Sequence, residues 1–305
     1  MTLPLLIYYG YPALINGSQS LDEAATHFMR YSLVLLGDGL QDGRHPNHDA
    51  ARELMTRLPQ VRFFGYVDLG VHSPHHAVQN LSLSEIEQRA RHWRKMGARG
   101  ILLDDYGYDF GNTRERQVEA VDAIHSAGLS TIANSWDPRH ALDSEPGPGN
   151  PRGLTSPLTS TDYYLYESYL VSQGNWVSFK QWRAKSNTLH RLLRTRPVQL
   201  LSCTTTERNG LEPEATRQFV YQCAWLEGHL ATAWGEPNFS AGDNQAPWRP
   251  PPQLPAGRRG QAQPRGNSAM YCTCEAGQAV ADYASKDFAI VVAKPWWRRW
   301  LPSRK

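Results

Sequence analysis

Carboxylates and aromatic residues follow a series of short apolar segments along this 305-residue chain. Asp104 comes directly after the apolar residues 101–103, and Glu167 follows the aromatic segment Tyr163–Tyr166. Cleavage of a glycosidic bond needs one carboxylic acid that protonates the leaving oxygen and a second group that acts as nucleophile, base or stabiliser of positive charge. Aromatic rings stack on the apolar faces of sugars. We therefore take Asp104 and Glu167 as the candidate catalytic pair.

Further polar and aromatic residues follow the other apolar segments, and we expect them to bind the substrate. Because adjacent strand residues point to opposite sides, Asp104 and Asp105 are not expected to face the same way, and one would support the other. Neighbouring carboxylates in a partly dry cleft raise one another's pKa, which keeps one of them protonated near neutral pH. The predicted substrate-binding residues are Tyr9, Tyr66, Asp68, Asp105, Asn134, Tyr169, Trp234 and Glu236.

Each of these polar residues also has a structural interpretation. Asp104 could cap a helix or pair with an arginine of a loop, and Glu167 could belong to a structural ion pair. Asn134 could bind a sugar hydroxyl or acetamido group, or it could form a turn. The residue types alone leave these alternatives open.

Eight segments rich in β-branched and aromatic residues alternate with segments of helical periodicity, which is typical of βαβ units and a parallel sheet. Two of the helices are predicted at 83–96 and 114–127, each followed by a glycine. Eight units in about 240 residues fit a single (β/α)8 TIM barrel. The rival, a doubly wound open sheet, lacks its Gly-rich phosphate turn after the first strand. The predicted strands are 3–11, 32–37, 61–69, 100–106, 130–136, 163–169, 198–204 and 229–234.

Composition divides the chain into a barrel at 1–240, a flexible Pro/Gly/Arg-rich loop at 241–269 and a C-terminal β extension at 270–305 that we expect to pack on the barrel. Two strands, 279–283 and 288–292, would form a hairpin in the extension. A second Pro/Gly/Ser-rich stretch, 137–161, follows the fifth strand and would enter the face on which barrel loops build active sites.

Charge and hydropathy exclude several classes of protein. The mean hydropathy is −0.55, and no apolar run approaches the roughly 18 residues of a membrane span. Residues 249–305 hold ten Lys/Arg and three Asp/Glu, so the remaining 248 residues are mildly acidic within a total of +3. An acidic body argues against nucleic acid as a partner. Neither a signal peptide nor a cofactor motif is visible, and the four cysteines lack the spacing of a zinc site.

Several short motifs occur in a familiar order. They are Tyr8-Tyr9-Gly10-Tyr11-Pro12, then Phe64-Gly65-Tyr66-Val67, then a helix carrying Trp93, and then Gly100-Ile101-Leu102-Leu103-Asp104-Asp105. This order resembles the spherulin-4-like glycoside hydrolases and the related endo-α-1,4-galactosaminidase TIM barrels over roughly residues 3–170.

The resemblance implies an endo-acting, retaining glycosidase without a cofactor. Asp104 matches the family's catalytic aspartate, and Asp105 replaces the glutamate that often follows it. Asn134 and Glu167 match the asparagine and glutamate that complete the site. The resemblance favours Glu167 as general acid/base and Asp104 as nucleophile or stabiliser, with Asn134 and Tyr9 contacting the sugar. It further implies an α-linked amino-sugar polysaccharide as substrate, and export from the cell.

Two other functions fit the same residues. A catalytically inactive carbohydrate-binding or structural barrel would keep aromatic residues in a groove, with Asp104 or Glu167 locked in a salt bridge. A metal-dependent hydrolase would use His72, His75 or His76 with Asp68, and it would lose activity on chelation. The sugar, the oligomeric state and the role of the Trp-rich segment 296–300 are left open by the sequence.

Overall fold

The structure, a computed structural model, describes residues 2–37, 39–73, 76–205, 214–236, 241–247 and 249–292. Asp38, which the second predicted strand approaches, lies outside the described residues, as do His75 and the Trp-rich segment 296–300. The chain forms two compact units, which are treated separately below. One comprises Leu3–Glu212 with Leu230–Pro251, and the other comprises Met1–Thr2, Pro213–His229 and Pro252–Lys305.

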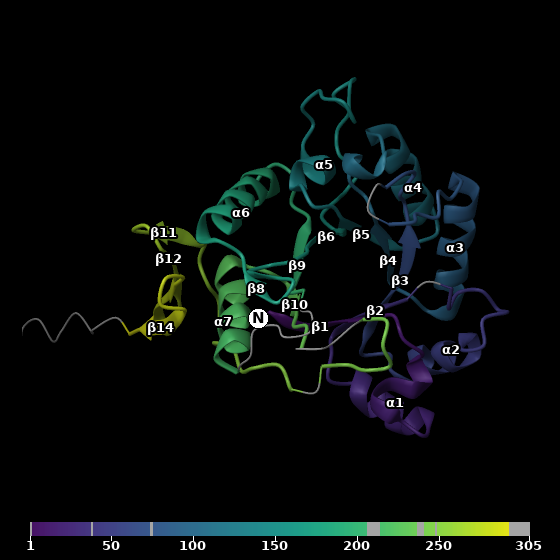
Figure 1. Cartoon of the computed structure of the whole chain (residues 1–305), viewed down its shortest axis with the longest axis horizontal. Coiled ribbons are helices and arrows are strands. Elements are labelled where there is room, and N and C mark those ends of the chain that lie inside the picture. Colours follow the sequence, from purple (N-terminus) through teal and green to yellow (C-terminus); the bar gives the residue numbers. More distant parts are fainter. Residues whose placement is uncertain are drawn as a thin grey trace, which may run out of the picture. The chain divides into compact units, whose positions relative to one another are not determined.

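Eight parallel strands close into a barrel in the first unit, so the predicted TIM-barrel fold is confirmed (Figure 1). The order around the barrel is β1-β10-β9-β6-β5-β4-β3-β2, and β1 pairs with both β2 and β10. Most strands end earlier than predicted, because the chain turns directly after the candidate polar residues. The bounds are β1 Leu3–Tyr8, β2 Leu33–Leu36, β3 Arg62–Asp68, β4 Gly100–Asp104, β5 Ser130–Asn134, β6 Tyr163–Tyr166, β9 Gln199–Cys203 and β10 Ala231–Ala233.

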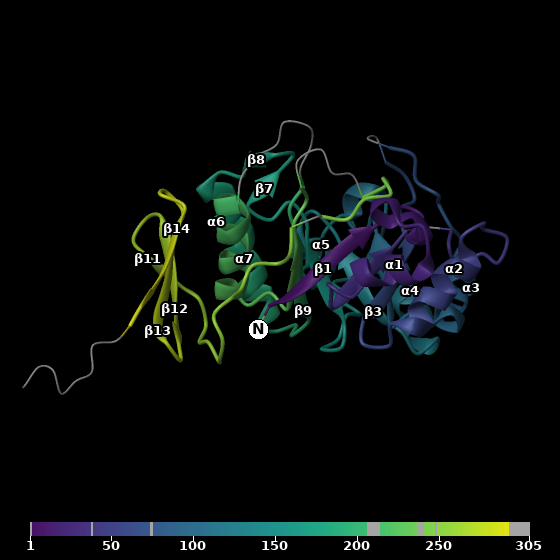
Figure 2. The same cartoon turned by 90° about the horizontal axis from the view of Figure 1, so that it is seen from below.

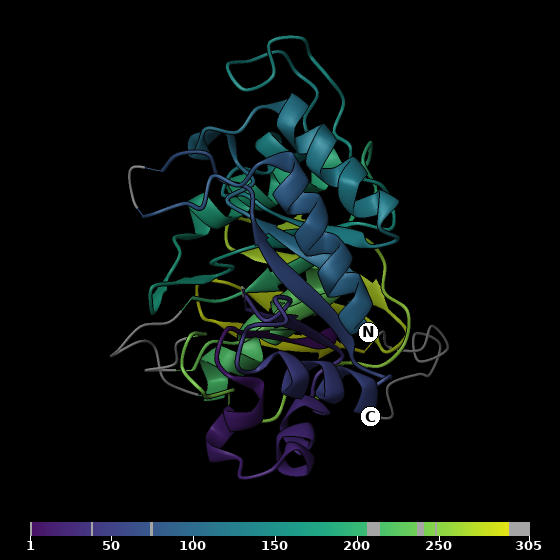
Figure 3. The ribbon, with the colours of Figure 1, turned by 90° about the vertical axis from the view of Figure 1, so that its right-hand side faces the viewer.

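Helices surround this ring of strands, and α3 and α4 lie side by side along it (Figure 3, blue and teal). Helix α3 begins where Ser82 and Glu85 form a capping box and ends at Gly97, whose φ is 108°. Its predicted span is therefore confirmed. The remaining elements of this unit are η1 Pro12–Gly17, α1 Leu21–Phe28, α2 His48–Arg57, α3 Leu83–Met96, η2 Tyr108–Phe110, α4 Arg114–Ser126, α5 Pro138–Leu142, β7 Val171–Ser172, β8 Asn175–Trp176 and α6 Phe179–Leu193.

Alternate residues of the eight strands fill the barrel interior. Phe64 and Tyr163, for example, meet edge to face with ring centroids 5.5 Å apart. Because the side-chain period of a strand is two, each strand offers the next inward position two residues further along. The buried interior residues are Leu5, Leu33, Leu35, Phe64, Leu102, Ile132, Tyr163, Leu165, Leu201, Cys203, Ala231 and Ala233.

Gly65 allows α3 to pack closely on β3. The buried Trp93 ring lies so near that a Cβ atom on residue 65 would be 2.2 Å from it. The Trp93 indole also donates a hydrogen bond to the Tyr66 carbonyl, at 3.3 Å. A side chain at position 65 would therefore separate helix from strand.

Asp162 ties β5 to β6 at the amino ends of the strands. Its buried carboxylate accepts hydrogen bonds from the backbone N–H groups of Thr131, at 2.8 Å, and Thr159, at 2.7 Å. It also pairs with Nε2 of His125, at 2.9 Å. This end of a TIM barrel serves stability rather than chemistry.

The second unit combines helix α7 (Glu214–Glu227) with a four-stranded antiparallel sheet, whose strands lie side by side in Figure 2. The predicted hairpin is present as β13 (Gly277–Asp282) and β14 (Asp287–Val291). Two strands were not predicted, β11 (Gln263–Arg265) and β12 (Ala269–Cys274). Strand β11 falls within the predicted flexible loop, because its three exposed residues, Gln263, Pro264 and Arg265, show no hydrophobic alternation.

Two aromatic contacts join α7 to this sheet. Phe219 meets Tyr283 with ring centroids 5.4 Å apart, and Trp225 meets Phe288 at 6.2 Å.

No helix among the described residues is long and apolar enough to cross a membrane.

We expect Gly65→Ala to lower the free energy of unfolding by about 3 kcal/mol, because the new methyl group clashes with the Trp93 ring. Gly43→Ala is the matched control, since a Cβ at residue 43 meets nothing within 4 Å. Urea denaturation of the two variants measures the difference. Equal stabilities would contradict the close packing of Trp93.

Protonation of His125 should stabilise the fold. Asp162 raises the pKa of His125. The pKa of Asp162 itself is lowered, because its hydrogen bonds to His125, Thr131 and Thr159 outweigh the opposing effect of burial. The histidine contribution is present below about pH 6.5 and is lost as pH rises through the raised value. The aspartate contribution is present above about pH 3.9 and is lost as pH falls through the lowered value.

We therefore expect His125→Gln to reduce the free energy of unfolding by about 1 kcal/mol near pH 5.5 and by less near pH 9. Denaturant titrations of the parent protein and the variant at both pH values test this. A loss that is the same at both pH values would show that the charge of His125 contributes nothing.

Candidate functional site

The inward positions at the carboxyl ends of β4, β5 and β6 carry Asp104, Asn134 and Glu167. Asp104 lies two residues beyond the core residue Leu102, and Asn134 lies two beyond Ile132. All three side chains line one cavity of about 1010 Å³. The structure thus brings the two candidate catalytic residues and the predicted asparagine together.

The amide of Asn134 bridges the two carboxylates. Its nitrogen donates to Oδ1 of Asp104 at 2.8 Å and to Oε2 of Glu167 at 3.1 Å. The two acceptor oxygens are therefore at most about 6 Å apart, which is close to the spacing of about 5 Å between the carboxyl groups of retaining glycosidases. Asn134 is thus a member of the site rather than a turn residue.

Two tyrosines surround Asp104 on the other side. Burial, together with the nearby Asp104 carboxylate, raises the pKa of Tyr66. The Tyr9 ring meets the Tyr66 ring edge to face, with centroids 5.5 Å apart. Tyr9 also lines the cavity, and burial and the charge of Asp104 raise its pKa. Both phenols consequently stay protonated.

Burial also affects the second carboxylate, Glu167. Burial, and to a smaller extent the charge of Asp104, raises the pKa of Glu167, although the Asn134 hydrogen bond and the positive charge of Lys185 oppose this shift. A raised pKa favours the protonated acid near neutral pH. The raised pKa of Glu167 suits the proton donor of such a pair, and the Asn134 amide holds Asp104 beside it.

The chain turns sharply after each of the two carboxylates. Asp105 and Ser168, the residues that follow them, have φ values of 49° and 56°. Positive φ is strained for residues other than glycine, and such strain clusters at functional sites. The prediction that Asp104 and Asp105 point to opposite sides was wrong, because strand alternation stops at Asp104 and both residues line the cavity.

Asp105 is buried and bound to a histidine of the loop after β3. Oδ2 of Asp105 lies 2.7 Å from Nε2 of His76, whose side chain is half exposed. Burial raises the pKa of Asp105 to about 6, against the opposing effect of the His76 hydrogen bond. His76 also lines the cavity, so this pair is part of its rim.

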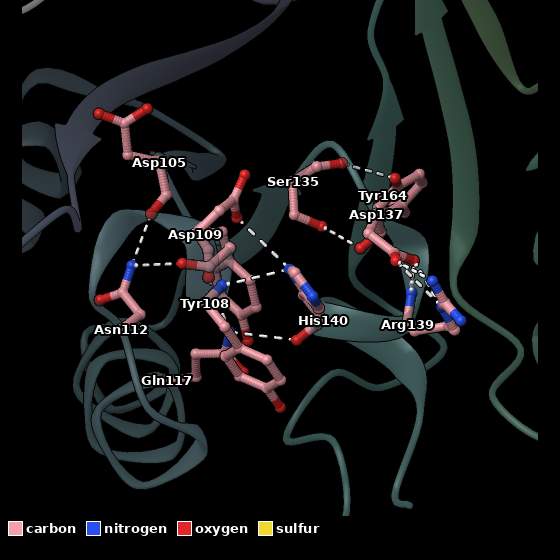
Figure 4. Close-up of polar contacts among 12 residues, drawn as sticks. Asp105, Tyr108, Asp109, Asn112, Gln117, Ser135, Asp137, Arg139, His140 and Tyr164 are labelled. Carbon is pink, nitrogen blue, oxygen red and sulfur yellow. Dashed lines mark hydrogen bonds and ion pairs between the residues drawn. The ribbon is translucent and has the colours of Figure 1, made fainter. Parts of the chain in front are cut away.

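A network of polar contacts fixes the loops after β4 and β5, as shown in Figure 4. Asn112 donates to the backbone carbonyl of Asp105, at 2.5 Å, and Gln117 donates to that of His140, at 3.1 Å. The Tyr164 hydroxyl donates to the carbonyl of Ser135, at 2.6 Å. These contacts hold the backbone that follows Asp104 and Asn134.

Other strands complete the cavity. Trp234, at the end of β10, lines it and is itself buried. Cys203 of β9 lies at the base, and burial raises the pKa of its thiol, so it stays uncharged. Of the predicted substrate-binding residues, the structure therefore places Tyr9, Asp105, Asn134 and Trp234 along the cavity, and Tyr66 against Asp104.

Asp68 does not line the cavity. Its buried carboxylate accepts hydrogen bonds from the backbone N–H of Gly70, at 2.7 Å, and that of Gln79, at 2.6 Å. It therefore closes the loop after β3. The position of Asp68 at a strand end suggested contact with the substrate, but both of its carboxylate oxygens accept hydrogen bonds from the loop backbone.

Tyr169 and Glu236 also lie away from the cavity. The Tyr169 ring is fully buried and packs against Tyr166, with centroids 5.2 Å apart. Glu236 is fully buried and pairs with Arg249 at 2.6 Å, while the Trp234 indole donates to it at 3.0 Å. A carboxylate that is saturated in this way anchors the chain after β10 instead of contacting a ligand.

Three residues that the sequence analysis did not select take part in the site. Trp136 lines the cavity two residues after Asn134, a spacing that could have identified it. Lys185 of α6 approaches Glu167, and its position three residues after the buried Trp182 marks it as inward-facing. Asp243 lines the cavity from a segment predicted to be flexible, and no sequence signal identified it.

Residues 241–247 form part of the cavity wall. The carbonyl of Ala241 accepts from the backbone N–H of Tyr9 at 2.6 Å, and Asn244 accepts from that of Tyr11 at 2.7 Å. Gly10 makes this approach possible, because a Cβ there would lie 2.6 Å from the carbonyl of Asp243. This part of the predicted flexible loop therefore pairs with the end of β1.

No group of three or more His, Cys, Asp or Glu side chains suited to a metal ion occurs among the described residues. Of the histidines considered for a metal site, His76 is bound to Asp105, and His75 lies outside the described residues.

Comparison with known proteins shows the fold. No protein-family model matches the sequence, and a search of curated proteins finds no match. Among solved structures, Amy13B of Eubacterium rectale superposes with a TM-score of 0.56, at 8% identity over 92% of this chain and 85% of that chain. Ligand-free cyclic α-maltosyl-(1→6)-maltose hydrolase from Arthrobacter globiformis gives 0.50, at 13% identity over 86% and 82%.

A third barrel, the glycoside hydrolase domain of PelA from Pseudomonas aeruginosa, gives a TM-score of 0.42, at 16% identity over 79% of this chain and 98% of that chain. Identities this low show a shared barrel fold and no more.

We expect His76→Ala to raise the pKa of Asp105 above its value of about 6, because the hydrogen bond that opposes the effect of burial is lost. Conversely, Asp105→Asn should lower the pKa of His76, since Asp105 raises it. Carbon-13 NMR titration of the carboxyl groups and proton NMR titration of the imidazole measure the two values. Titration curves unchanged by either substitution would show that the pair does not form in solution.

Proposed function

We propose that this chain is a glycoside hydrolase that acts through Asp104 and Glu167. The observation that carries the proposal is the Asn134 amide, which holds the two carboxylates together in a cavity lined by aromatic residues. A barrel of similar fold is named as a hydrolase of a cyclic maltosyl sugar, which is consistent with this chemistry on this fold.

The surroundings of the two carboxylates support different roles. The Asn134 amide donates a hydrogen bond to Oδ1 of Asp104, and we assign this carboxylate the role of nucleophile. Burial raises the pKa of Glu167, as a general acid requires. In the proposed reaction Asp104 attacks the anomeric carbon while Glu167 protonates the departing oxygen. A water molecule, deprotonated by Glu167, then cleaves the glycosyl-aspartate ester.

The short distance between the carboxylates supports retention of configuration. An inverting enzyme places a water molecule between its carboxyl groups, which separates them by about 6.5–9.5 Å. The shared amide nitrogen limits the distance between the acceptor oxygens of Asp104 and Glu167 to about 6 Å, which is below that range.

For the substrate we propose an α-linked amino-sugar polysaccharide, as the resemblance to spherulin-4-like enzymes implies. The charge of the cavity supports a cationic, partly deacetylated chain, because Asp104, Asp105, Glu167 and Asp243 line it and no lysine or arginine does among the described residues.

The inactive-barrel alternative predicts a carboxylate locked in a salt bridge. Within the described part of the chain, neither Asp104 nor Glu167 forms an ion pair, whereas Glu236 does. The pair is therefore held by neutral donors, which leaves both carboxylates able to react.

Hydrolysis of amino-sugar and neutral polysaccharides tests the proposal. We expect Asp104→Asn and Glu167→Gln each to lower kcat by about 1,000-fold or more, since each removes a covalent or acid–base step. Asp122→Asn is the matched control, because this exposed carboxylate of α4 lies outside the cavity lining. Proton NMR of the first product should show the configuration of the substrate.

Activity that survives both substitutions would exclude this carboxylate pair, and inverted product would exclude Asp104 as nucleophile. If the folded parent protein cleaves no polymer yet binds one, the carbohydrate-binding barrel becomes the better description.

A further inference from the structure

Trp136 is the most exposed aromatic ring on the cavity. Its side chain is 58% exposed, whereas Trp234, on the same cavity, is 3% exposed. Leaving so large an apolar surface in water is unfavourable, and such surfaces mark binding sites when they border a cleft. Trp136 comes two residues after Asn134, and it lines the same cavity as the carboxylate pair.

A buried ammonium group covers the opposite face of this ring. Nζ of Lys185 lies 4.4 Å from the Trp136 ring centroid and 4.5 Å from that of Tyr166. The nitrogen is buried and has no hydrogen-bond partner among the described residues. Its interactions there are with two π faces, which attract a cation by their quadrupoles.

This arrangement holds Trp136 in a defined plane. The ammonium group fills the space behind the indole, so only the outer face is open to the cavity. Tyr166, the other ring of the stack, directly precedes Glu167, and the charge of Glu167 acts on Lys185. The stack therefore connects an open aromatic face to the candidate acid.

The strand order places a second aromatic ring across the barrel. Trp136 follows β5, and Tyr9 follows β1, which lies four strands away in the closed ring of eight. Asp104 and Glu167 follow β4 and β6, on the two sides of β5. A sugar chain lying across the cavity would thus meet Tyr9 near one end and Trp136 near the other.

We propose that the open face of Trp136 is a subsite that stacks on a pyranose ring of the substrate, and that Lys185 is a positioning residue that holds this face in place. The inference rests on the proposed glycosidase function and adds to it a binding site beyond the scissile bond. The ligand class is an oligosaccharide whose ring presents an apolar face of C–H groups.

Binding to the Glu167→Gln variant, which should not turn substrate over, tests the subsite. The probes are de-N-acetylated α-1,4-galactosamine oligosaccharides of two to six units, followed by calorimetry. We expect Trp136→Ala, in that background, to weaken binding of the longest probe by about tenfold. Tyr11→Ala is the matched control, because its exposed ring lies outside the cavity lining and should leave binding unchanged.

Turnover by the otherwise unaltered protein separates failure of the subsite from failure of the proposed function. If the parent protein cleaves the polymer and Trp136→Ala changes neither KM nor probe affinity, the subsite is refuted while the hydrolase stands. If no probe binds and no polymer is cleaved, both are refuted. A raised KM with little change in kcat supports the subsite.

Lys185→Met and Lys185→Arg test the positioning role. Methionine fills a similar space without the charge, so the fold should be retained, whereas arginine keeps a cation against both rings. We expect Lys185→Met to raise KM as Trp136→Ala does. Lys185→Arg should give a KM between that of Lys185→Met and that of the parent protein.

A spectroscopic readout separates positioning from simple packing. Burial lowers the pKa of Lys185 to about 8, against the opposing charges of Glu167, Cys203 and Asp137. The emission of Trp136, obtained by subtracting the spectrum of Trp136→Phe, should therefore titrate near pH 8 and stop doing so in Lys185→Met. An unchanged titration in Lys185→Met would overturn the role of Lys185.

Discussion

A closed barrel of parallel strands points every second side chain into one shared interior, and the candidate site depends on this alternation. Leu102 and Ile132 fill the core, and the next inward positions on the same strands are Asp104 and Asn134. The register that packs the hydrophobic core thus also delivers polar groups to the cavity. A shift of one residue in any of these strands would turn its polar side chain outward.

Two carboxylates held close together in a partly buried cavity repel each other, and the surrounding structure offsets this cost. The Asn134 amide donates a hydrogen bond to each of them. Positive φ at Asp105 and Ser168 keeps the chain turning at the rim directly after the carboxylates. Gains elsewhere, such as the packing of large buried rings, allow a fold to retain strain of this kind.

The outer parts of the site are built by loops. Asp68 and Glu236 hold the chain after β3 and β10, and residues 241–247 pair with the end of β1. Lys185 reaches the same region from the middle of α6. The cavity wall therefore combines segments that are distant along the chain, while the carboxylate pair comes from β4 and β6, which flank β5 in the barrel.

The sequence by itself determined the barrel and the span of α3, and it placed Asp104, Asn134 and Glu167 near the carboxyl ends of their strands, because periodicity and capping are local properties. It could not decide that Asp105 turns into the cavity, since a left-handed residue ends the alternation on which the prediction was based. Nor could the sequence distinguish the environments of two glutamates. Glu236 forms an ion pair with Arg249, whereas Glu167 accepts a hydrogen bond from the Asn134 amide. Those outcomes depend on which partner the closed barrel brings within hydrogen-bond distance, and only the tertiary structure decides that.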